Sequence, residues 1–195
     1  MNIQTFVGKD IAPCIPHLAR LRMTVFRAFP YLYEGSADYE ETYLATYAAS
    51  PDSVFVLAFE GGEIVGASTG LPMADETDEV KAPFLASGRD PAGIFYFGES
   101  VLLESYRGRG IGVRFFEERE AHARRLGRFS TLAFCAVERP PHHPARPADY
   151  VPLHAFWGRR GFVHHPELVA EFRWRDIGDA QETGKPLSFW LKDLS

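Results

Sequence analysis

Short apolar runs alternate with amphipathic stretches along this chain, a pattern typical of an α/β protein. Ser53–Glu60 and Glu63–Gly70 are rich in β-branched and aromatic residues, and Gly61-Gly62 separates them, which predicts a hairpin with a tight turn. Further strands are predicted over Ile94–Leu103 and over Phe129–Val137, the second of which is an apolar run typical of a buried position.

Helical periodicity is clearest over Gly110–Gly127, where Ile111, Phe115, His122 and Leu126 share one face. Capping residues and apolar spacing predict the other helices, which are Asp10–Ala28, Ser36–Ala49, Val80–Ala86 and Val151–Arg160. Shorter strands are expected near Ile3–Val7, Val169–Arg175 and Pro186–Lys192. The alternation predicts one α/β (α+β) domain over residues 1–195, with a mixed sheet flanked by helices.

Length, charge and cysteine content narrow the class of protein. A chain of 195 residues is long enough for one domain with a full core, and a net charge of −5 gives no reason to expect nucleic acid as the main partner. No apolar run approaches the roughly 18 residues that span a bilayer, and the first residues lack the pattern of a signal peptide. Cys14 and Cys135 are far apart, which predicts two free thiols in a reducing cytoplasm.

The run Glu104–Val113 (ESYRGRGIGV) is the strongest candidate for ligand binding, because it joins a predicted strand to a predicted helix. Gly108, Gly110 and Gly112 leave their backbone amides uncovered by side chains. The positive end of the helix dipole adds to the attraction, so the turn predicts a site for phosphate or pyrophosphate. The spacing excludes the dinucleotide motif Gly-x-Gly-x-x-Gly, since Val113 occupies its last position.

The same turn resembles motif A of the GNAT N-acetyltransferase superfamily, in which Arg or Gln is followed by two residues, Gly, one residue, and Gly or Ala. Those positions are Arg107, Gly110 and Gly112 in this chain. Phe156–Phe162 (FWGRRGF) looks like a second signature of the family, an aromatic helix that closes on Gly-Phe. The element order is similar along nearly the whole chain. The resemblance implies a mostly antiparallel sheet with splayed central strands, and acetyl-coenzyme A as cosubstrate.

The resemblance also implies where the cosubstrate lies. Its pyrophosphate is expected on the amides of Gly108–Val113, and its pantetheine arm is expected along the strand before the turn, like an added strand. Trp157 and its neighbour are expected to pack against pantetheine or the core. The full set of expected contacts is Ser100, Val101, Leu102, Arg107, Gly108, Arg109, Gly110, Ile111, Gly112, Val113, Phe156 and Trp157.

Glu99 is the candidate base that must take a proton from the acceptor amine. It lies within an apolar run, where desolvation would raise its pKa toward neutrality, and the family often uses a carboxylate on this strand. Alternate strand residues face opposite sides, so a structural carboxylate paired with an arginine stays open as the other interpretation. Many family members carry Tyr where this chain has Trp157, which leaves Tyr150, a water or unassisted departure for protonation of the thiolate.

In the resembled fold, the loop that holds Tyr31, Tyr33 and Glu34 borders the acceptor site. Either these rings wall the acceptor pocket while Glu34 attracts a cation, or the loop is simply packed. Glu138 has two interpretations as well, an acceptor-site residue or a solvated carboxylate.

Neither a nucleophilic role for Cys135 nor a metal site at the histidine pairs is expected. A lone cysteine in an apolar strand is usually a packing residue rather than a nucleophile. His142-His143 and His164-His165 are adjacent pairs, which rarely direct both rings at one ion, so no metal site is expected.

These observations predict an N-acetyltransferase that moves an acetyl group from acetyl-coenzyme A to an amine by direct transfer in a ternary complex. The expected acceptor is the amine of a small molecule. Two alternatives stay open. One is a coenzyme A-binding sensor without turnover, and the other is transfer to a protein N-terminus or lysine. Dimers are common among the proteins that the chain resembles, so a homodimer is also an expectation.

Overall fold

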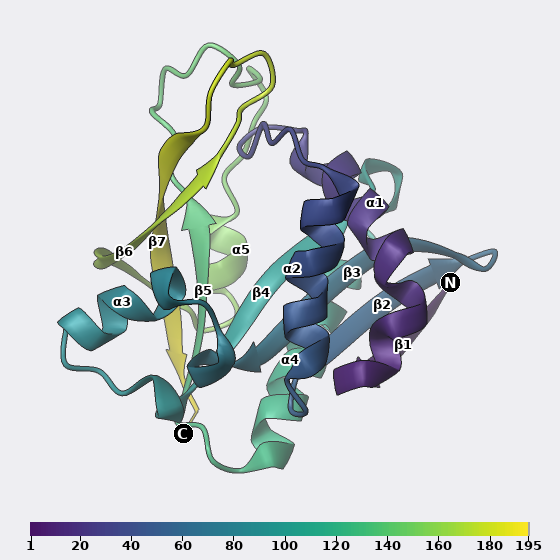
Figure 1. The fold of residues 1–195 in the computed structure, drawn as a ribbon, viewed down its shortest axis with the longest axis vertical. Coiled ribbons are helices and arrows are strands. Elements are labelled where there is room, and N and C mark those ends of the chain that lie inside the picture. The colour runs from purple at the N-terminus through teal and green to yellow at the C-terminus, as the bar shows by residue number, and fades with distance from the viewer. Residues whose placement is uncertain (195) are drawn as a thin grey trace.

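The computed structural model describes residues 1–194, so Ser195, the last residue of the predicted domain, lies outside the described part. The described chain is built on a seven-stranded sheet with the order β1-β2-β3-β4-β5-β7-β6 (Figure 1). Its strands are β1 (Asn2–Val7), β2 (Val54–Glu60), β3 (Glu63–Pro72), β4 (Ile94–Leu102), β5 (Thr131–Val137), β6 (Val163–Trp174) and β7 (Thr183–Asp193).

Neighbouring strands are antiparallel throughout this sheet except for β4 and β5, which run parallel. The mixed, mostly antiparallel sheet is therefore confirmed. β4 and β5 pair only between Ile94–Tyr96 and Thr131–Ala133, and the two strands diverge beyond these residues. The expected splay of the central strands is thus present, at the centre of the sheet in Figure 1.

Helices cover both faces of the sheet (Figure 1). α1 (Ile15–Phe26) and α2 (Ala37–Ala49) lie on one face, where their apolar side chains join one buried cluster. α4 (Ile111–Leu126) lies on the other face and contributes to a second cluster. The remaining helices are α3 (Asp78–Ala86), α5 (His154–Gly158) and the 3₁₀ helices Gly8–Cys14, Met73–Asp75, Pro91–Gly93 and Glu104–Tyr106.

Two predicted helices are wrong at their ends. Asp10–Ala28 is divided, since residues Gly8–Cys14 form a 3₁₀ helix and the α-helix begins at Ile15, next to Pro16 in its first turn. Val151–Arg160 shortens to the five residues of α5. The strand expected near Val169–Arg175 is longer, because β6 already begins at Val163.

Arg119 is a fully buried charge in the middle of α4, with 1% of its surface exposed. Its guanidinium donates to the carbonyl oxygens of Thr69 and Glu99 at 3.1 and 3.3 Å and to the hydroxyl of Ser100 at 2.9 Å. Burial lowers the pKa of Arg119 to about 9, although the charge of Glu99 opposes this shift. The side chain also lies over the ring of Phe97. Arg119 therefore fixes α4 to the backbone of β3 and β4, next to an irregularity in their pairing.

Replacing Arg119 with Met is expected to lower the free energy of unfolding by about 3 kcal/mol, because two buried carbonyls lose a charged donor. Urea unfolding followed by circular dichroism measures this loss. The control is Arg125→Met, which alters an exposed residue of the same helix and should stay within about 0.5 kcal/mol of the wild type. Equal stability of the two variants would contradict the structural role of Arg119.

Candidate active site

The divergence of β4 from β5 leaves one side of β4 without a strand partner beyond Tyr96. On its other side, β4 continues to pair with β3 as far as Leu102. The expected cosubstrate contacts Ser100, Val101 and Leu102 lie in this half of β4. An extended chain can add to such an open edge through backbone hydrogen bonds.

The glycine-rich turn follows β4 directly and leads into α4. Gly108 and Gly110 have φ angles of +75° and +80°, which favour glycine, and a Cβ at either position would meet no atom within 4 Å. The amides of Gly108, Arg109 and Gly110 donate to no acceptor in the described part of the chain. At the start of α4, the amide of Val113 donates to the carbonyl of Gly110 at 3.0 Å, whereas those of Ile111 and Gly112 have no acceptor among residues 1–194. The turn therefore presents uncovered donors from Gly108 to Gly112 to an anion.

Three arginines flank this turn and differ in whether their side chains form an ion pair. Arg107 and Arg109 are exposed beside the glycines, and Arg109 donates to the carbonyl of Ser105 at 2.8 Å. Arg114 in the first turn of α4 is already paired with Glu118 at 2.6 Å. Arg107 and Arg109 are therefore the better placed to add positive charge to the amides.

Phe156 and Trp157 face the core from α5. The ring of Phe156 packs edge-on against Phe116 of α4, and a Cβ on Gly112 would meet it at 3.4 Å. Trp157 packs against Phe134 and Trp190, with centroids 5.1 Å apart in both pairs. Core packing is thus present, and a contact with pantetheine stays a prediction.

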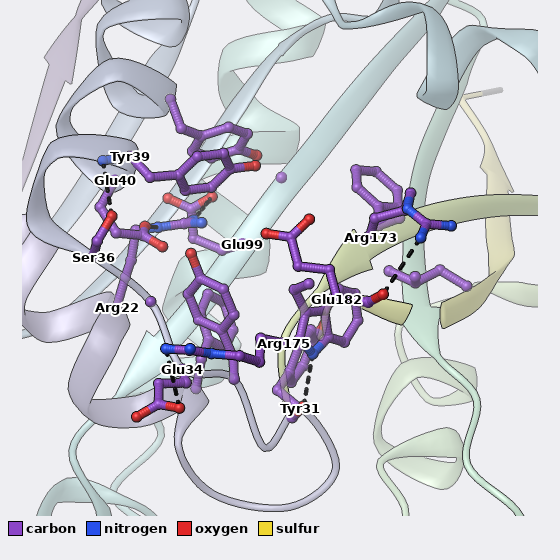
Figure 2. A pocket seen from close by; sticks show the side chains of 18 of the residues that line it. Arg22, Tyr31, Glu34, Ser36, Tyr39, Glu40, Glu99, Arg173, Arg175 and Glu182 are labelled. Carbon is purple, nitrogen blue, oxygen red and sulfur yellow. Dashed lines mark hydrogen bonds and ion pairs between the residues drawn. The ribbon is translucent and has the colours of Figure 1, made fainter. Parts of the chain in front are cut away.

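A cavity of about 540 Å³ lies beside β4, on the face covered by α1 and α2. The predicted residues Tyr31, Tyr33, Glu34 and Glu99 all line it, together with groups from β5 and β6 (Figure 2). Eight aromatic residues line it, and these are Phe26, Tyr31, Tyr33, Tyr39, Tyr43, Tyr96, Phe172 and Trp174. Segments far apart in the sequence thus meet around one partly open cavity.

Glu99 has only 7% of its surface exposed and contacts a buried arginine. The Nη1 atom of Arg22 lies 2.6 Å from Oε2 of Glu99, and its Nε atom donates to Glu40 of α2. Burial alone would lower the pKa of Arg22, but the neighbouring carboxylates raise it well above its ordinary value. Figure 2 shows the three side chains gathered at one side of the cavity. Glu99 therefore both lines the cavity and takes part in an ion pair.

Arg139 connects the loop that holds Tyr31 to Asp176, which lies just after β6. It donates to the carbonyls of Pro30 and Tyr31, both at 2.7 Å, and to both carboxylate oxygens of Asp176. The indole of Trp174 also donates to the carbonyl of Tyr31, at 3.1 Å. These contacts hold the wall that carries Tyr31 against β6.

Of the other candidate residues, Tyr150 and Glu138 do not line the cavity, whereas Cys135 does. The ring of Tyr150 packs edge-on against Phe29 at 4.7 Å, and neither Tyr150 nor Glu138 is among the residues that line the cavity. Glu138 is exposed, with a carboxylate oxygen 3.7 Å from His164. Cys135 lines the cavity, but burial raises its thiol pKa to about 12, which opposes a role as a nucleophile.

A family model described as "Acetyltransferase (GNAT) family" matches residues 18–162. The chain belongs to this family. No curated protein matches the sequence. The GNAT acetyltransferase fold is also found in solved structures at low identity.

A ribosomal-protein-alanine N-acetyltransferase from Brucella melitensis is 14% identical, with a TM-score of 0.63 and full coverage of both chains. Aminoglycoside 6'-acetyltransferase type Ii is 16% identical, with a TM-score of 0.58 over 99% of this chain and 97% of its own. The acetyltransferase yncA from Salmonella typhimurium, solved with acetyl-CoA, is 11% identical, with a TM-score of 0.61 over 100% of this chain and 95% of its own. At these identities the likeness shows the GNAT fold alone.

Sequence reasoning missed the arginines of this GNAT site. Arg22 occupies the apolar face of α1 with Leu18 and Leu21, all three of which are buried. A charged residue on an apolar stripe is a signal that indicates a buried partner. Arg139 carried no such signal, because it lies in a proline-rich loop and its partners come from distant segments.

No three histidine, cysteine, aspartate or glutamate side chains among residues 1–194 come together to hold a metal ion. None of the helices in that range is both long and apolar enough to span a bilayer.

Asp176→Asn is expected to show how strongly the Arg139 contact stabilises the domain. Partial burial alone would raise the pKa of Asp176, but Arg139 and Lys185 hold it below its ordinary value. A lowered carboxyl pKa contributes stability above the unfolded-state pKa of about 4, and this contribution is lost as the pH falls through the folded-state pKa. The variant should therefore lose about 2 kcal/mol at pH 7, and the difference from wild type should shrink as the pH falls below the unfolded-state pKa.

Thermal unfolding across this pH range measures the effect. Asp179→Asn is the control, because Asp179 is exposed on the same turn. A stability difference for Asp176→Asn that does not change with pH would contradict the ion pair.

Proposed function

We propose that this GNAT protein transfers an acetyl group from acetyl-coenzyme A to the amine of a small molecule, directly, in a ternary complex. The observation that carries the proposal is the cavity beside the open edge of β4, which has the buried carboxylate of Glu99 in its wall. A partly open cavity of about 540 Å³, with eight aromatic rings in its wall, suits a small acceptor with an apolar body. A volume of this size supports a small amine over a protein N-terminus or lysine.

The proposal assigns the cosubstrate to the open edge and the glycine turn. The pyrophosphate would accept hydrogen bonds from the amides of Gly108–Gly112, because the amide of Val113 already donates to the carbonyl of Gly110. The side chains of Arg107 and Arg109 would add charge. The pantetheine arm would lie along Ser100, Val101 and Leu102. This arrangement directs the thioester toward Glu99, since pantetheine follows β4 from the turn back to the cavity. Two free cysteines agree with the predicted cytoplasmic location, and the homodimer stays a prediction.

The chemistry then depends on position and proton transfer. Holding the amine and the thioester together removes most of the entropic barrier to their reaction. As the nitrogen bonds to the thioester carbon, it must lose a proton, and we assign that proton to Glu99. Protonation of the thiolate by Tyr150 stays a prediction, because its ring lies against Phe29 rather than in the cavity wall.

The sensor alternative predicts binding without turnover. A buried carboxylate in the wall of a cavity beside β4 favours the enzyme, since a protein that only binds coenzyme A needs no acceptor site. Release of thiol from acetyl-coenzyme A, measured with a broad panel of amines, separates the two. Tight cofactor binding without acceptor-dependent release would support the sensor.

Glu99→Gln is expected to lower kcat for acceptor-dependent thiol release about a hundredfold, because the amide cannot accept the proton. The control is Glu171→Gln, which changes an exposed carboxylate on β6 and should leave the rate unchanged. Equal rates of thiol release in the wild type and in Glu99→Gln would support an enzyme but contradict the assignment of Glu99 as the base.

Gly110→Ala is expected to weaken coenzyme A binding about tenfold, since a left-handed conformation costs an L-residue about 1 to 2 kcal/mol and the turn must shift. Isothermal titration calorimetry gives the dissociation constant. Gly88→Ala is a matched control, because Gly88 also has a positive φ angle, of +74°, with open space around its Cβ position. Unchanged affinity in Gly110→Ala would count against a pyrophosphate site at this turn.

A further inference from the structure

Glu76 is a second buried carboxyl group near the cavity, and the chemistry above does not use it. It follows the 3₁₀ helix after β3 and has 5% of its surface exposed. Tyr47 donates a hydrogen bond to its Oε1 atom, and the amide of Thr77 donates to Oε2 at 2.9 Å. Among residues 1–194, no lysine or arginine forms an ion pair with it, in contrast to Glu99.

A chain of hydroxyl groups connects this carboxyl group to the cavity. Tyr43 lines the cavity, and its hydroxyl donates to that of Tyr47 at 2.9 Å. The hydroxyl of Tyr47 donates in turn to Glu76. The two tyrosines are four residues apart on α2, so their side chains lie on the same face of the helix. A continuous hydrogen-bonded path therefore leads from the cavity to a buried acid.

Gly98 of β4 makes room for this path. A Cβ at this position would lie 2.7 Å from the Tyr47 hydroxyl and 2.5 Å from Oγ1 of Thr69. Any larger residue would displace the middle of the chain. The side chain of Tyr47 therefore requires a glycine at position 98, next to Glu99.

We propose that Tyr43, Tyr47 and Glu76 form a proton relay that deprotonates the acceptor when it enters the cavity as an ammonium ion. The inference rests on the proposed function. One N–H bond of the ammonium breaks and its proton bonds to the oxygen of Tyr43, while the proton of Tyr43 passes to Tyr47 and that of Tyr47 passes to Glu76. Both hydroxyls are regenerated, the carboxylate becomes a carboxylic acid, and the nitrogen keeps its lone pair for attack.

The acceptor loses two protons in the overall reaction, and we assign one to Glu76 and the other to Glu99. An ammonium ion loses one proton before it becomes a nucleophile and a second as the amide forms. Glu99 lines the cavity and is assigned the second under the proposed function. Glu76 suits the first, because burial raises its pKa, although Tyr47 and Thr77 oppose this shift through hydrogen bonds. The titratable groups that act on it are Tyr43, Tyr47, Lys81, Glu99, Tyr96 and Cys135.

The test compares pH profiles of kcat/KM for the wild type, Glu76→Gln and Tyr47→Phe. Gln preserves an acceptor for the Tyr47 hydroxyl but cannot take up the proton. Both variants should lose about a hundredfold in kcat/KM at pH 7. The deficit should shrink as the pH approaches the pKa of the amine, because the acceptor then arrives already deprotonated. A packing defect would instead lower the rate by the same factor at every pH.

Ser50→Ala is the matched control, because Ser50 closes the same helix and donates to Asp75, the residue before Glu76, at 2.6 Å. This variant removes a hydrogen bond between the same two segments outside the relay, so its pH profile should match that of the wild type. A constant deficit in Glu76→Gln and Tyr47→Phe, or a profile shift in Ser50→Ala of the same size, would overturn the relay.

A second readout does not depend on turnover. Infrared difference spectra of the full chain, taken over a pH titration, should show a carboxylic acid band that Glu76→Gln lacks. The band should lose intensity on ionisation at a pH above the ordinary glutamate range. A Glu76 that stays protonated at all pH values at which the wild type works would overturn the relay. Absence of acceptor-dependent thiol release by the wild type would instead contradict the proposed function, and the infrared titration would still decide whether Glu76 can accept a proton.

Discussion

The divergence of β4 from β5 is the constraint on which the rest of the structure depends. Two parallel strands that paired along their full length would leave neither an open backbone edge nor space for a cavity beside it. Because the pairing ends after Tyr96 and Ala133, half of β4 loses a row of hydrogen bonds at the centre of the sheet. Such a gap is stable only if other groups hold the strand in place, since unpaired buried backbone costs free energy.

Two buried arginines hold the unpaired half of β4 from opposite faces of the sheet. Arg119 of α4 binds the carbonyl of Glu99, and Arg22 of α1 binds its side chain. A guanidinium suits both tasks, because it offers several donors in a fixed plane and keeps its charge when buried. The same residue is thereby fixed at its backbone and at its carboxylate. The candidate site is thus positioned by charge and hydrogen bonding where the ladder of the sheet no longer does so.

The sequence was sufficient for local features and insufficient for contacts between distant segments. The hairpin at Gly61-Gly62, the order of strands and helices and the open glycine turn follow from residues that act on their own neighbours. Arg119 was passed over, although it shares the apolar stripe of Phe115 and His122, because an arginine is expected at the surface. The contact of Arg139 with Asp176 joins residues 37 positions apart, which no local pattern encodes.

The two carboxylates near the cavity show why chemical roles are harder to predict than elements. In the sequence, Glu76 lies in a polar segment beside Asp75 and Asp78, whereas Glu99 lies in an apolar predicted strand. In the fold, Glu99 contacts a guanidinium, while Glu76 contacts a phenol and an amide. A cation favours the charged carboxylate, whereas burial without a cation favours the proton-bound acid. The difference arises from α1, which brings Arg22 to one carboxylate and not to the other, so packing of a helix decides which acid is suited to hold a proton.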